Sequence, residues 1–178
     1  VNIVDATALE RSLYLTTQLM ELDCDVIVAM NMADILEKKG ISIDFKKLEE
    51  ELGVSVVRIS AKTGEGIDKL IRERKYLKNP RKQIFASDIE KELTHLQGDL
   101  SHELEDKREL RFSAVKLFEN DPFYQALNND STKKEISELE KKYDMDAEQI
   151  IADQRYQFVT KIKQDCCFQK DMPESLTD

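Results

Sequence analysis

No apolar run in the sequence approaches the roughly 20 residues that a helix needs to span a bilayer. Tryptophan is absent, and there are only five glycines and three prolines in 178 residues, which is typical of a mostly helical globular protein. The three cysteines do not form an even framework, and sequence neighbours such as Cys166 and Cys167 rarely pair with each other. The sequence therefore excludes a disulfide-stapled scaffold and predicts reduced thiols.

The sequence also lacks the positive charge that nucleic acid binding requires. Its formal net charge is −9, divided into −2 for residues 1–79 and −7 for residues 80–178. A surface of this sign repels phosphate backbones and anionic lipid headgroups. We therefore expect no nucleic acid partner and no direct binding of the second half to a membrane surface.

The first half alternates between strand and helix patterns. Apolar, β-branched runs indicate strands at 1–4, 26–30 and 54–59. Helical patterns follow them at 8–22, 34–39, 44–52 and 67–77. Such alternation predicts right-handed crossovers and a parallel sheet. Residues 1–79 are therefore predicted to be α/β, with an incomplete three-stranded parallel sheet of the doubly wound type.

The pattern changes at Asn79-Pro80, because the residue before proline is pushed out of the helical region. One apolar stripe then steps by 4, 3, 4 and 4 residues along Ile89, Leu93, Leu96, Leu100 and Leu104. Further helices are expected at 110–119, 122–127, 132–143 and 146–166, and no strand candidate follows residue 79. We predict an all-α helical bundle domain at 80–169 and a polar tail at 170–178.

Polar residues follow two of the predicted strands. Asn31 and Asp34 come after the second strand, and Ser60-Ala-Lys62 comes after the third. The carboxyl ends of parallel strands meet at one edge of the sheet, where open α/β sheets bind ligands. An ionised Asp accepts from two adjacent N–H groups, and guanine offers such a pair in its ring N1–H and its amino group. The spacing predicts a guanine site. The alternative is that Asn31 lies in a turn while Asp34 and Ser60 cap helices.

This ordered pair of motifs resembles the two guanine-specificity motifs of the translation-factor-like GTPases. Three further matches resemble one family, ferrous iron transport protein B (FeoB). Val1-Asn-Ile-Val-Asp-Ala-Thr-Ala-Leu-Glu-Arg-Ser-Leu-Tyr-Leu-Thr16 is similar to a strand-and-helix segment of its GTPase domain. Met30-Asn-Met-Ala-Asp34 is similar to its base motif, and Ile151-Ala-Asp-Gln-Arg-Tyr156 to a helix of its helical domain.

The resemblance implies roles for the first loop. Asn31 would hydrogen-bond the Hoogsteen edge of guanine, and Asp34 would accept from N1–H and the amino group. Met32 would lay its flexible side chain along one face of the ring system.

The resemblance also implies roles for the second loop. Backbone amides of Ser60 and Ala61 would hold the guanine carbonyl oxygen and orient Asp34. Lys62 would cover the other face of the base. The implied cofactor is GTP or GDP.

None of the five glycines begins the phosphate-binding motif G-x-x-x-x-G-K-[S/T]. We therefore expect no catalytic residue and no GTP hydrolysis by this chain alone, with Mg²⁺ bound only through segments absent from it. By this interpretation the chain begins inside a domain. Its strand at Val1–Val4 would then be an open edge, to be filled by a missing N-terminal GTPase half or by another copy of the chain.

The resemblance implies a part of the cytosolic GTP-binding region of a ferrous iron uptake transporter. Its helical domain would modulate GDP release, a membrane permease domain would follow downstream, and the whole would lie at the cytoplasmic face of the inner membrane. The alternative is a non-enzymatic helical interaction module with a vestigial α/β half.

Three places in the sequence carry residue types that can ligate a metal. His95 and His102 are seven residues apart, about 10 Å along one helix, which is too far for joint chelation. We expect both histidines to be solvated. Cys166 and Cys167 are expected to be one buried and one exposed thiol, and Asp5 is expected to cap a helix rather than to bind Mg²⁺. The sequence thus predicts no metal site.

Overall fold

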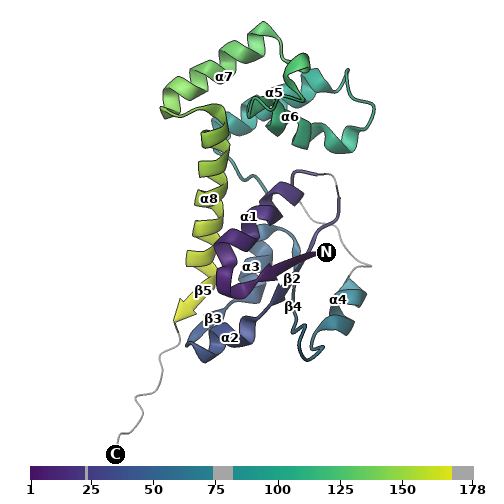
Figure 1. Ribbon diagram of the computed structural model, residues 1–178, viewed down its shortest axis with the longest axis vertical. Coiled ribbons are helices and arrows are strands. Elements are labelled where there is room, and N and C mark those ends of the chain that lie inside the picture. The colour runs from purple at the N-terminus through teal and green to yellow at the C-terminus, as the bar shows by residue number, and fades with distance from the viewer. Residues whose placement is uncertain (23, 74–81, 170–178) are drawn as a thin grey trace, which may run out of the picture. The chain divides into compact units, whose positions relative to one another are not determined.

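The computed structural model describes residues 1–22, 24–73 and 82–169 (Figure 1). These residues form two compact units. The sheet unit contains residues 1–16, 25–73, 82 and 159–169, and the helical unit contains residues 17–22, 24 and 83–158. The boundary predicted at Asn79-Pro80, the last residues of the helix expected at 67–77 and the tail at 170–178 lie outside the described residues.

The sheet unit is built on a parallel sheet in the order β1-β2-β4 (Figure 1). The strands are β1 (Asn2–Asp5), β2 (Ile27–Asn31) and β4 (Ser55–Arg58). Asp5 stands beside Asn31 in one ladder, and Met30 stands beside Arg58 in the other. The prediction of a three-stranded parallel sheet in an α/β fold is confirmed.

The central strand is apolar because both of its faces are covered. Residues 27–30 are at most 2% exposed. Alternate side chains point to opposite faces, and one face packs in a cluster with two residues of α4 (Ile67–Glu73): Ile27, Ala29, Val57, Ile59, Ile67 and Leu70. Further buried leucines come from α1 (Leu9–Leu19) and α3 (Phe45–Leu52): Leu9, Leu13, Leu48 and Leu52. An apolar run without alternation is what such double burial requires.

A second, two-stranded sheet was not predicted. β3 (Ile41–Ile43) pairs antiparallel with β5 (Cys167–Gln169), and the Asp44 N–H donates to the Cys166 carbonyl oxygen at 2.9 Å. The prediction of no strand after residue 79 is therefore wrong at 167–169. Three residues are too few to show a period, and their pairing partner lies more than 120 residues earlier in the chain. Between β2 and β3 stands the short helix α2 (Ala33–Lys38).

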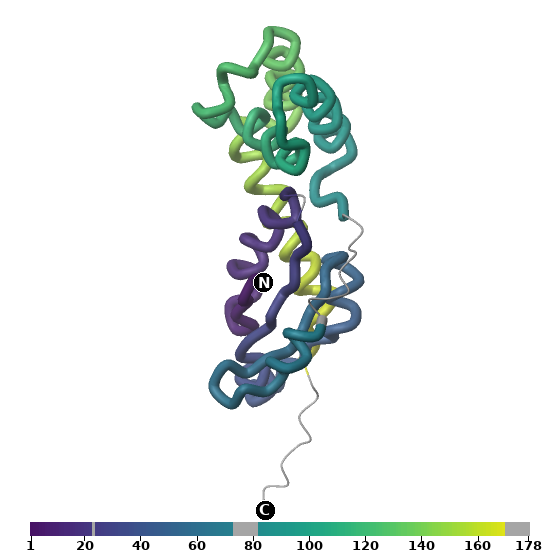
Figure 2. The backbone as a smooth tube through the Cα atoms, turned by 90° about the vertical axis from the view of Figure 1, so that its right-hand side faces the viewer, coloured from purple at the N-terminus to yellow at the C-terminus, as the bar shows by residue number. Residues whose placement is uncertain are grey.

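The helical unit consists of helices, as predicted for the second half, and α5 and α6 lie side by side in it (Figure 2). Its elements are α5 (Ser87–Leu100), α6 (Leu110–Phe118), α7 (Asp130–Tyr143), the first twelve residues of α8 (Ala147–Cys166) and the short 3-10 helices Lys107–Glu109 and Gln125–Leu127. The predicted stripe is buried from Ile89 to Leu100. The helix ends there, before Leu104, which is only partly buried.

Ion pairs are buried in the helical unit. The Arg155 guanidinium donates two hydrogen bonds from Nη2 to the Glu21 carboxylate, at 2.9 and 3.0 Å, and one from Nη1 to Glu119 Oε1 at 3.0 Å. Arg155 and Glu21 are 2% and 0% exposed. A second bidentate pair joins Arg111 to Glu90, which also accepts from the Phe85 N–H. Each buried charge thus meets an opposite charge in hydrogen-bonding geometry.

Candidate nucleotide-binding site

The loops after β2 and β4 meet at the carboxyl end of the parallel sheet. The Asn31 side-chain oxygen accepts a hydrogen bond from the Ala61 N–H at 3.1 Å. Asn31 is the last residue of β2, and Ala61 follows the end of β4 by three residues. The adjacency arises because both strands run in the same direction in neighbouring positions. The two motifs, 30 residues apart in the sequence, therefore form one continuous polar rim.

Met32 makes the turn from strand to helix. It has φ 64° and ψ 19°, the left-handed conformation, and it is the residue before α2. Its side chain is 40% exposed, which is high for a methionine in an otherwise buried segment. A residue other than glycine at positive φ carries a steric cost, which lowers the stability of the fold. The turn nevertheless places the apolar side chain of Met32 beside the rim.

Asp34 lies in the first turn of α2 rather than at its cap. The cap position is Met32, which makes no side-chain capping bond, so the alternative that Asp34 caps the helix is wrong. The Asp34 side chain is 50% exposed, and its ion pair with Lys38 is long, at 3.7 Å. The carboxylate is thus accessible to a ligand that offers N–H donors.

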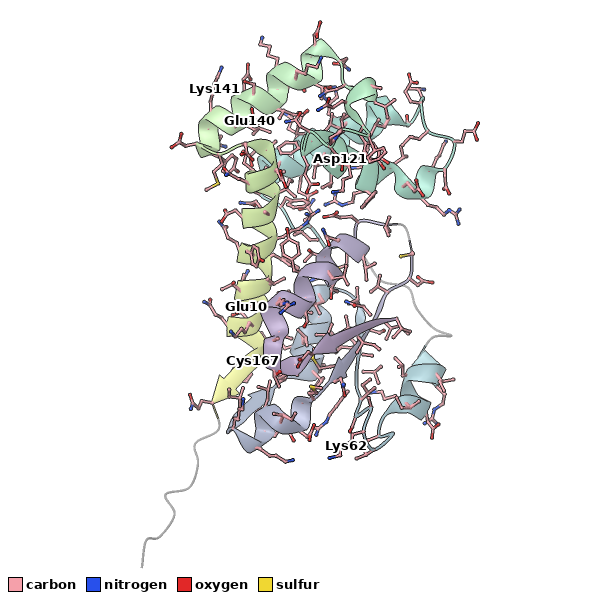
Figure 3. The ribbon with its side chains drawn as sticks, in the orientation of Figure 1. Glu10, Lys62, Asp121, Glu140, Lys141 and Cys167 are labelled. Atoms are coloured by element: carbon pink, nitrogen blue, oxygen red, sulfur yellow. The ribbon has the colours of Figure 1, made fainter. Side chains whose placement is uncertain are left out.

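The Ser60–Gly66 loop is closed by its own hydrogen bonds. The Ser60 N–H donates to the Glu65 carbonyl oxygen at 2.9 Å, and the Gly64 N–H donates to the Ser60 carbonyl oxygen at 2.8 Å. The Ser60 hydroxyl accepts from the Thr63 N–H, so it caps a turn and not α4. Lys62 projects from the tip of this loop (Figure 3). Both amides assigned to the guanine carbonyl already have protein acceptors, Glu65 for Ser60 and Asn31 for Ala61.

One supporting pair was missed from the sequence. The Arg58 guanidinium binds the Glu37 carboxylate through two hydrogen bonds of 2.6 and 3.1 Å. Arg58 ends β4 and Glu37 lies on α2, so the pair joins the helix that carries Asp34 to the strand that precedes Ser60. Both side chains are more than a third exposed, so the pair contributes little energy and serves mainly to fix geometry. In the sequence, the only sign of this pair is the cationic residue Arg58 near the end of the strand predicted at 54–59.

Two other sequence candidates have structural roles. The Asp5 carboxylate accepts from the N–H and the hydroxyl of Thr7 and caps the 3-10 turn Ala6–Ala8, as expected. Cys166 is buried and Cys167 is partly buried. Burial raises the pKa of both thiols, that of Cys166 to about 11, which opposes metal binding by thiolate.

Gly66 lies where the Ser60–Gly66 loop packs against the backbone of Arg58, so substitution there tests this contact. It has φ +79°, and a Cβ atom there would clash with the Arg58 carbonyl oxygen. Gly64 has the same φ, but a Cβ atom there would meet nothing within 4 Å. We expect Gly66→Ala to lower the free energy of unfolding by about 2 kcal/mol and Gly64→Ala by only about 1 kcal/mol. Urea titration of both variants measures the difference, and equal losses would show that the contact with Arg58 does not matter.

Known proteins resemble this chain over most of its length. The Fe(2+) transporter FeoB of Leptospira biflexa is 34% identical over 129 residues, which cover 70% of this chain and 19% of that protein. The Fe(2+) transporter FeoB of Legionella pneumophila is 56% identical over 70 residues, which cover 39% and 9%. A crystal structure of mGMPPNP-bound NFeoB from S. thermophilus superposes with a TM-score of 0.79 at 34% identity, covering 98% of this chain and 68% of that one.

The parallel sheet, its rim and these structural neighbours define a GTPase-type α/β domain followed by a helical region. The family model for ferrous iron transport protein B matches residues 1–74, and the model for the FeoB cytosolic helical domain matches residues 85–167. The chain belongs to the FeoB family, and the resemblance found in the sequence is confirmed. This chain spans about a fifth of the length of the Leptospira relative. No helix in the described ranges is long and apolar enough to cross a membrane.

Proposed function

We propose that this chain supplies guanine-base recognition, through residues 1–79, and a helical domain that modulates GDP release, through residues 80–169. It would do so in the cytosolic region of a ferrous iron transporter, at the cytoplasmic face of the inner membrane and upstream of the membrane permease. The observation that carries the proposal is the hydrogen bond from the Ala61 N–H to Asn31 Oδ1, which joins the two motif loops into one rim.

The rim has the chemistry to discriminate guanine. Asp34 accepts from N1–H and the amino group, while Asn31 binds the Hoogsteen edge. Met32 and Lys62 cover the two faces of the base. The Ala61 N–H then serves two acceptors, Asn31 Oδ1 and the guanine carbonyl oxygen, because it is already engaged in the protein. Removing a partner from paired purine donors costs about 1–3 kcal/mol each, which is enough for strong preference over adenine.

Phosphate and Mg²⁺ contacts belong to other segments in this proposal, because the sequence contains no phosphate loop. We assign the open edge of β1 to a strand of an upstream GTPase half or of a second copy of the chain. Ile3 on this strand and Val1 just before it are 69% and 71% exposed, and an exposed apolar edge favours strand pairing.

Titration with fluorescent GDP and ADP tests the proposal. Two proteins are compared: this chain, and a longer version extended upstream by about 80 residues, roughly half the length of such a domain. We expect GDP-selective binding in the longer version and at most weak binding in the shorter one. A light-scattering mass should report self-association of the shorter chain only. Failure of both proteins to bind GDP would favour a non-enzymatic helical interaction module.

A further inference from the structure

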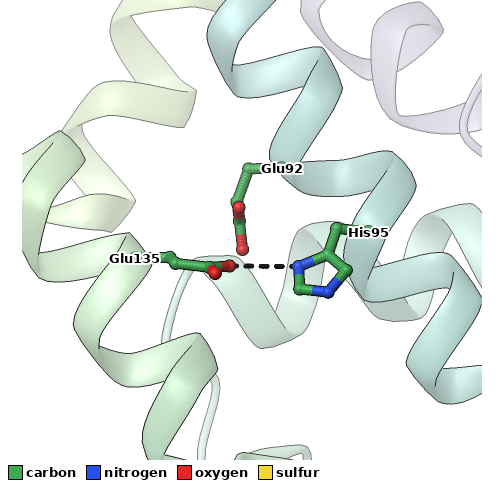
Figure 4. A group of neighbouring side chains, drawn as sticks. All are labelled: Glu92, His95 and Glu135. Carbon is green, nitrogen blue, oxygen red and sulfur yellow. Dashed lines mark hydrogen bonds and ion pairs between the residues drawn. The ribbon is translucent and has the colours of Figure 1, made fainter.

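Three metal-ligating side chains converge on one face of the helical unit. Glu92 and His95 lie on α5, and Glu135 lies on α7 (Figure 4). The spacing of three residues places Glu92 and His95 on the same side of their helix. Glu135, forty residues further along the chain, approaches from the facing helix. The cluster lies within the helical unit, and the nucleotide site lies in the sheet unit.

The ligand atoms are close enough to share an ion. All three lie within 4.8 Å of one another, and His95 Nδ1 is 3.0 Å from Glu135 Oε2. Donors that surround a metal at about 2.0–2.2 Å are themselves roughly 3.0–3.5 Å apart. The His95–Glu135 pair already has this spacing, and the Glu92 oxygen lies within 4.8 Å of both. Figure 4 shows the Glu92 carboxylate directed toward that of Glu135.

The cluster has one polar atom that no described residue satisfies. Glu92 Oε1 is buried, and it has no hydrogen-bond partner within the described ranges. Two ionised carboxylates only accept hydrogen bonds, so Glu135 satisfies this atom only when the pair shares a proton. A buried acceptor without a partner costs about 1–3 kcal/mol, and more when it is charged. A cation placed between the two carboxylates removes this cost.

The electrostatics of the cluster also call for a cation. The nearby Lys142 is already committed, since its ammonium group binds Asp88 at 2.7 Å. Lys91 also lines the hollow beside the cluster, and a divalent cation between the Glu92 and Glu135 carboxylates lowers the repulsion between them.

Space for water is present beside the cluster. A hollow of about 660 Å³ is bounded by α5 and α7. Besides the three ligands it is lined by two further acids, two lysines and a leucine: Asp88, Glu138, Lys91, Lys142 and Leu139. An ion with three protein ligands can complete its coordination with water from this hollow, which is the arrangement of open metal sites.

We propose that Glu92, His95 and Glu135 bind one first-row divalent transition metal ion. The single imidazole favours ions such as Zn²⁺, Fe²⁺ or Mn²⁺ over Ca²⁺ and Mg²⁺, which prefer ligand sets made only of oxygen. This proposal replaces the expectation of no metal site. That expectation compared His95 only with His102, whereas the partners of His95 are a glutamate three residues earlier and another from a second helix.

Zn²⁺ titration of the full chain tests the proposal, because the chain has only two histidines and they report separately. One equivalent of Zn²⁺ should shift the imidazole ¹⁵N resonances of His95 and leave those of His102 unchanged. Calorimetry should give one Zn²⁺ site per chain. The affinity for Zn²⁺ should fall at least tenfold in both Glu92→Gln and Glu135→Gln. Millimolar Mg²⁺ should lower the affinity of the parent only slightly. The matched variants Glu103→Gln and His102→Ala alter exposed residues beyond the end of α5 and should bind as the parent does.

Two results would overturn the site. In one, His95 resonances stay in place at one equivalent of Zn²⁺, as they would if the ion bound only to thiols or if a proton were shared between the carboxylates. In the other, the glutamine variants bind Zn²⁺ as tightly as the parent. The thermal transitions of these variants without metal show whether they are folded, so a lost site is distinguished from a lost fold.

Discussion

Arg155→Ala is expected to lower the free energy of unfolding by about 3–5 kcal/mol. The substitution leaves Glu21, which is 0% exposed, as a buried charge without its cation. Glu119 loses one hydrogen bond but keeps its pairing with Lys116 at 2.8 Å. The loss is large because an unpaired buried carboxylate is far costlier than the same group in water.

The pH dependence of the loss identifies its cause. Burial raises the pKa of Glu21 to about 6, and Arg155 opposes that rise. Without Arg155 the pKa rises further, so protonation neutralises Glu21 in the folded variant more readily than in the unfolded chain. The deficit of Arg155→Ala relative to the parent should therefore shrink as the pH falls from 7 to 5.

Urea titrations at the two pH values measure this deficit. Arg108→Ala is the matched control, because Arg108 pairs with Asp106 at the surface and its side chain is 73% exposed. It should cost less than about 1 kcal/mol at both pH values. A deficit for Arg155→Ala that does not change with pH would mean that lost packing, and not the charge of Glu21, causes the destabilisation.

Asp34→Asn is expected to remove about 2–3 kcal/mol of preference for guanine, a factor of roughly 30 to 150 in relative affinity. The new amide can accept only through its oxygen, and its NH₂ group opposes the guanine amino group. Xanthine carries a carbonyl oxygen in place of that amino group, so the variant should gain affinity for XDP as it loses affinity for GDP. The fold should be little affected, since Asp34 is half exposed and its ion pair is long.

Competition between GDP and XDP in the longer protein provides the measurement. Asp68→Asn is the control, because Asp68 also lies exposed in the first turn of a helix of the sheet unit, α4. It should leave the ratio of the two affinities unchanged. The same ratio in Asp34→Asn as in the parent would remove Asp34 from the base site.

Local patterns were sufficient to predict the parallel sheet and the meeting of the two motif loops. A strand covered on both faces leaves a continuous apolar run such as residues 27–30, and parallel strands end at a common edge. The prediction that the base is guanine depended on the motifs themselves, and above all on Asp34. The pattern predicted that Asn31 and Ala61 lie close together. It did not predict the hydrogen bond between them.

The features missed from the sequence depend on partners far apart in the chain. Arg58 meets Glu37 across 21 residues, and His95 meets Glu135 across 40. β5 was missed because three residues cannot show a period, and its strand character comes from pairing with β3. The positive φ of Met32 has no signature either, since the residue type normally avoids it. Tertiary packing decides each of these.

The short β3–β5 ladder gives the sheet unit a mechanical coupling. A pull on the backbone at Gln169 is carried along β5 and shared, through the inter-strand hydrogen bonds, with β3. β3 begins three residues after the end of α2, the helix that bears Asp34. Tension along β5 is therefore passed to the segment that directly follows α2, so a force on one end of this unit reaches a helix about 130 residues earlier in the chain.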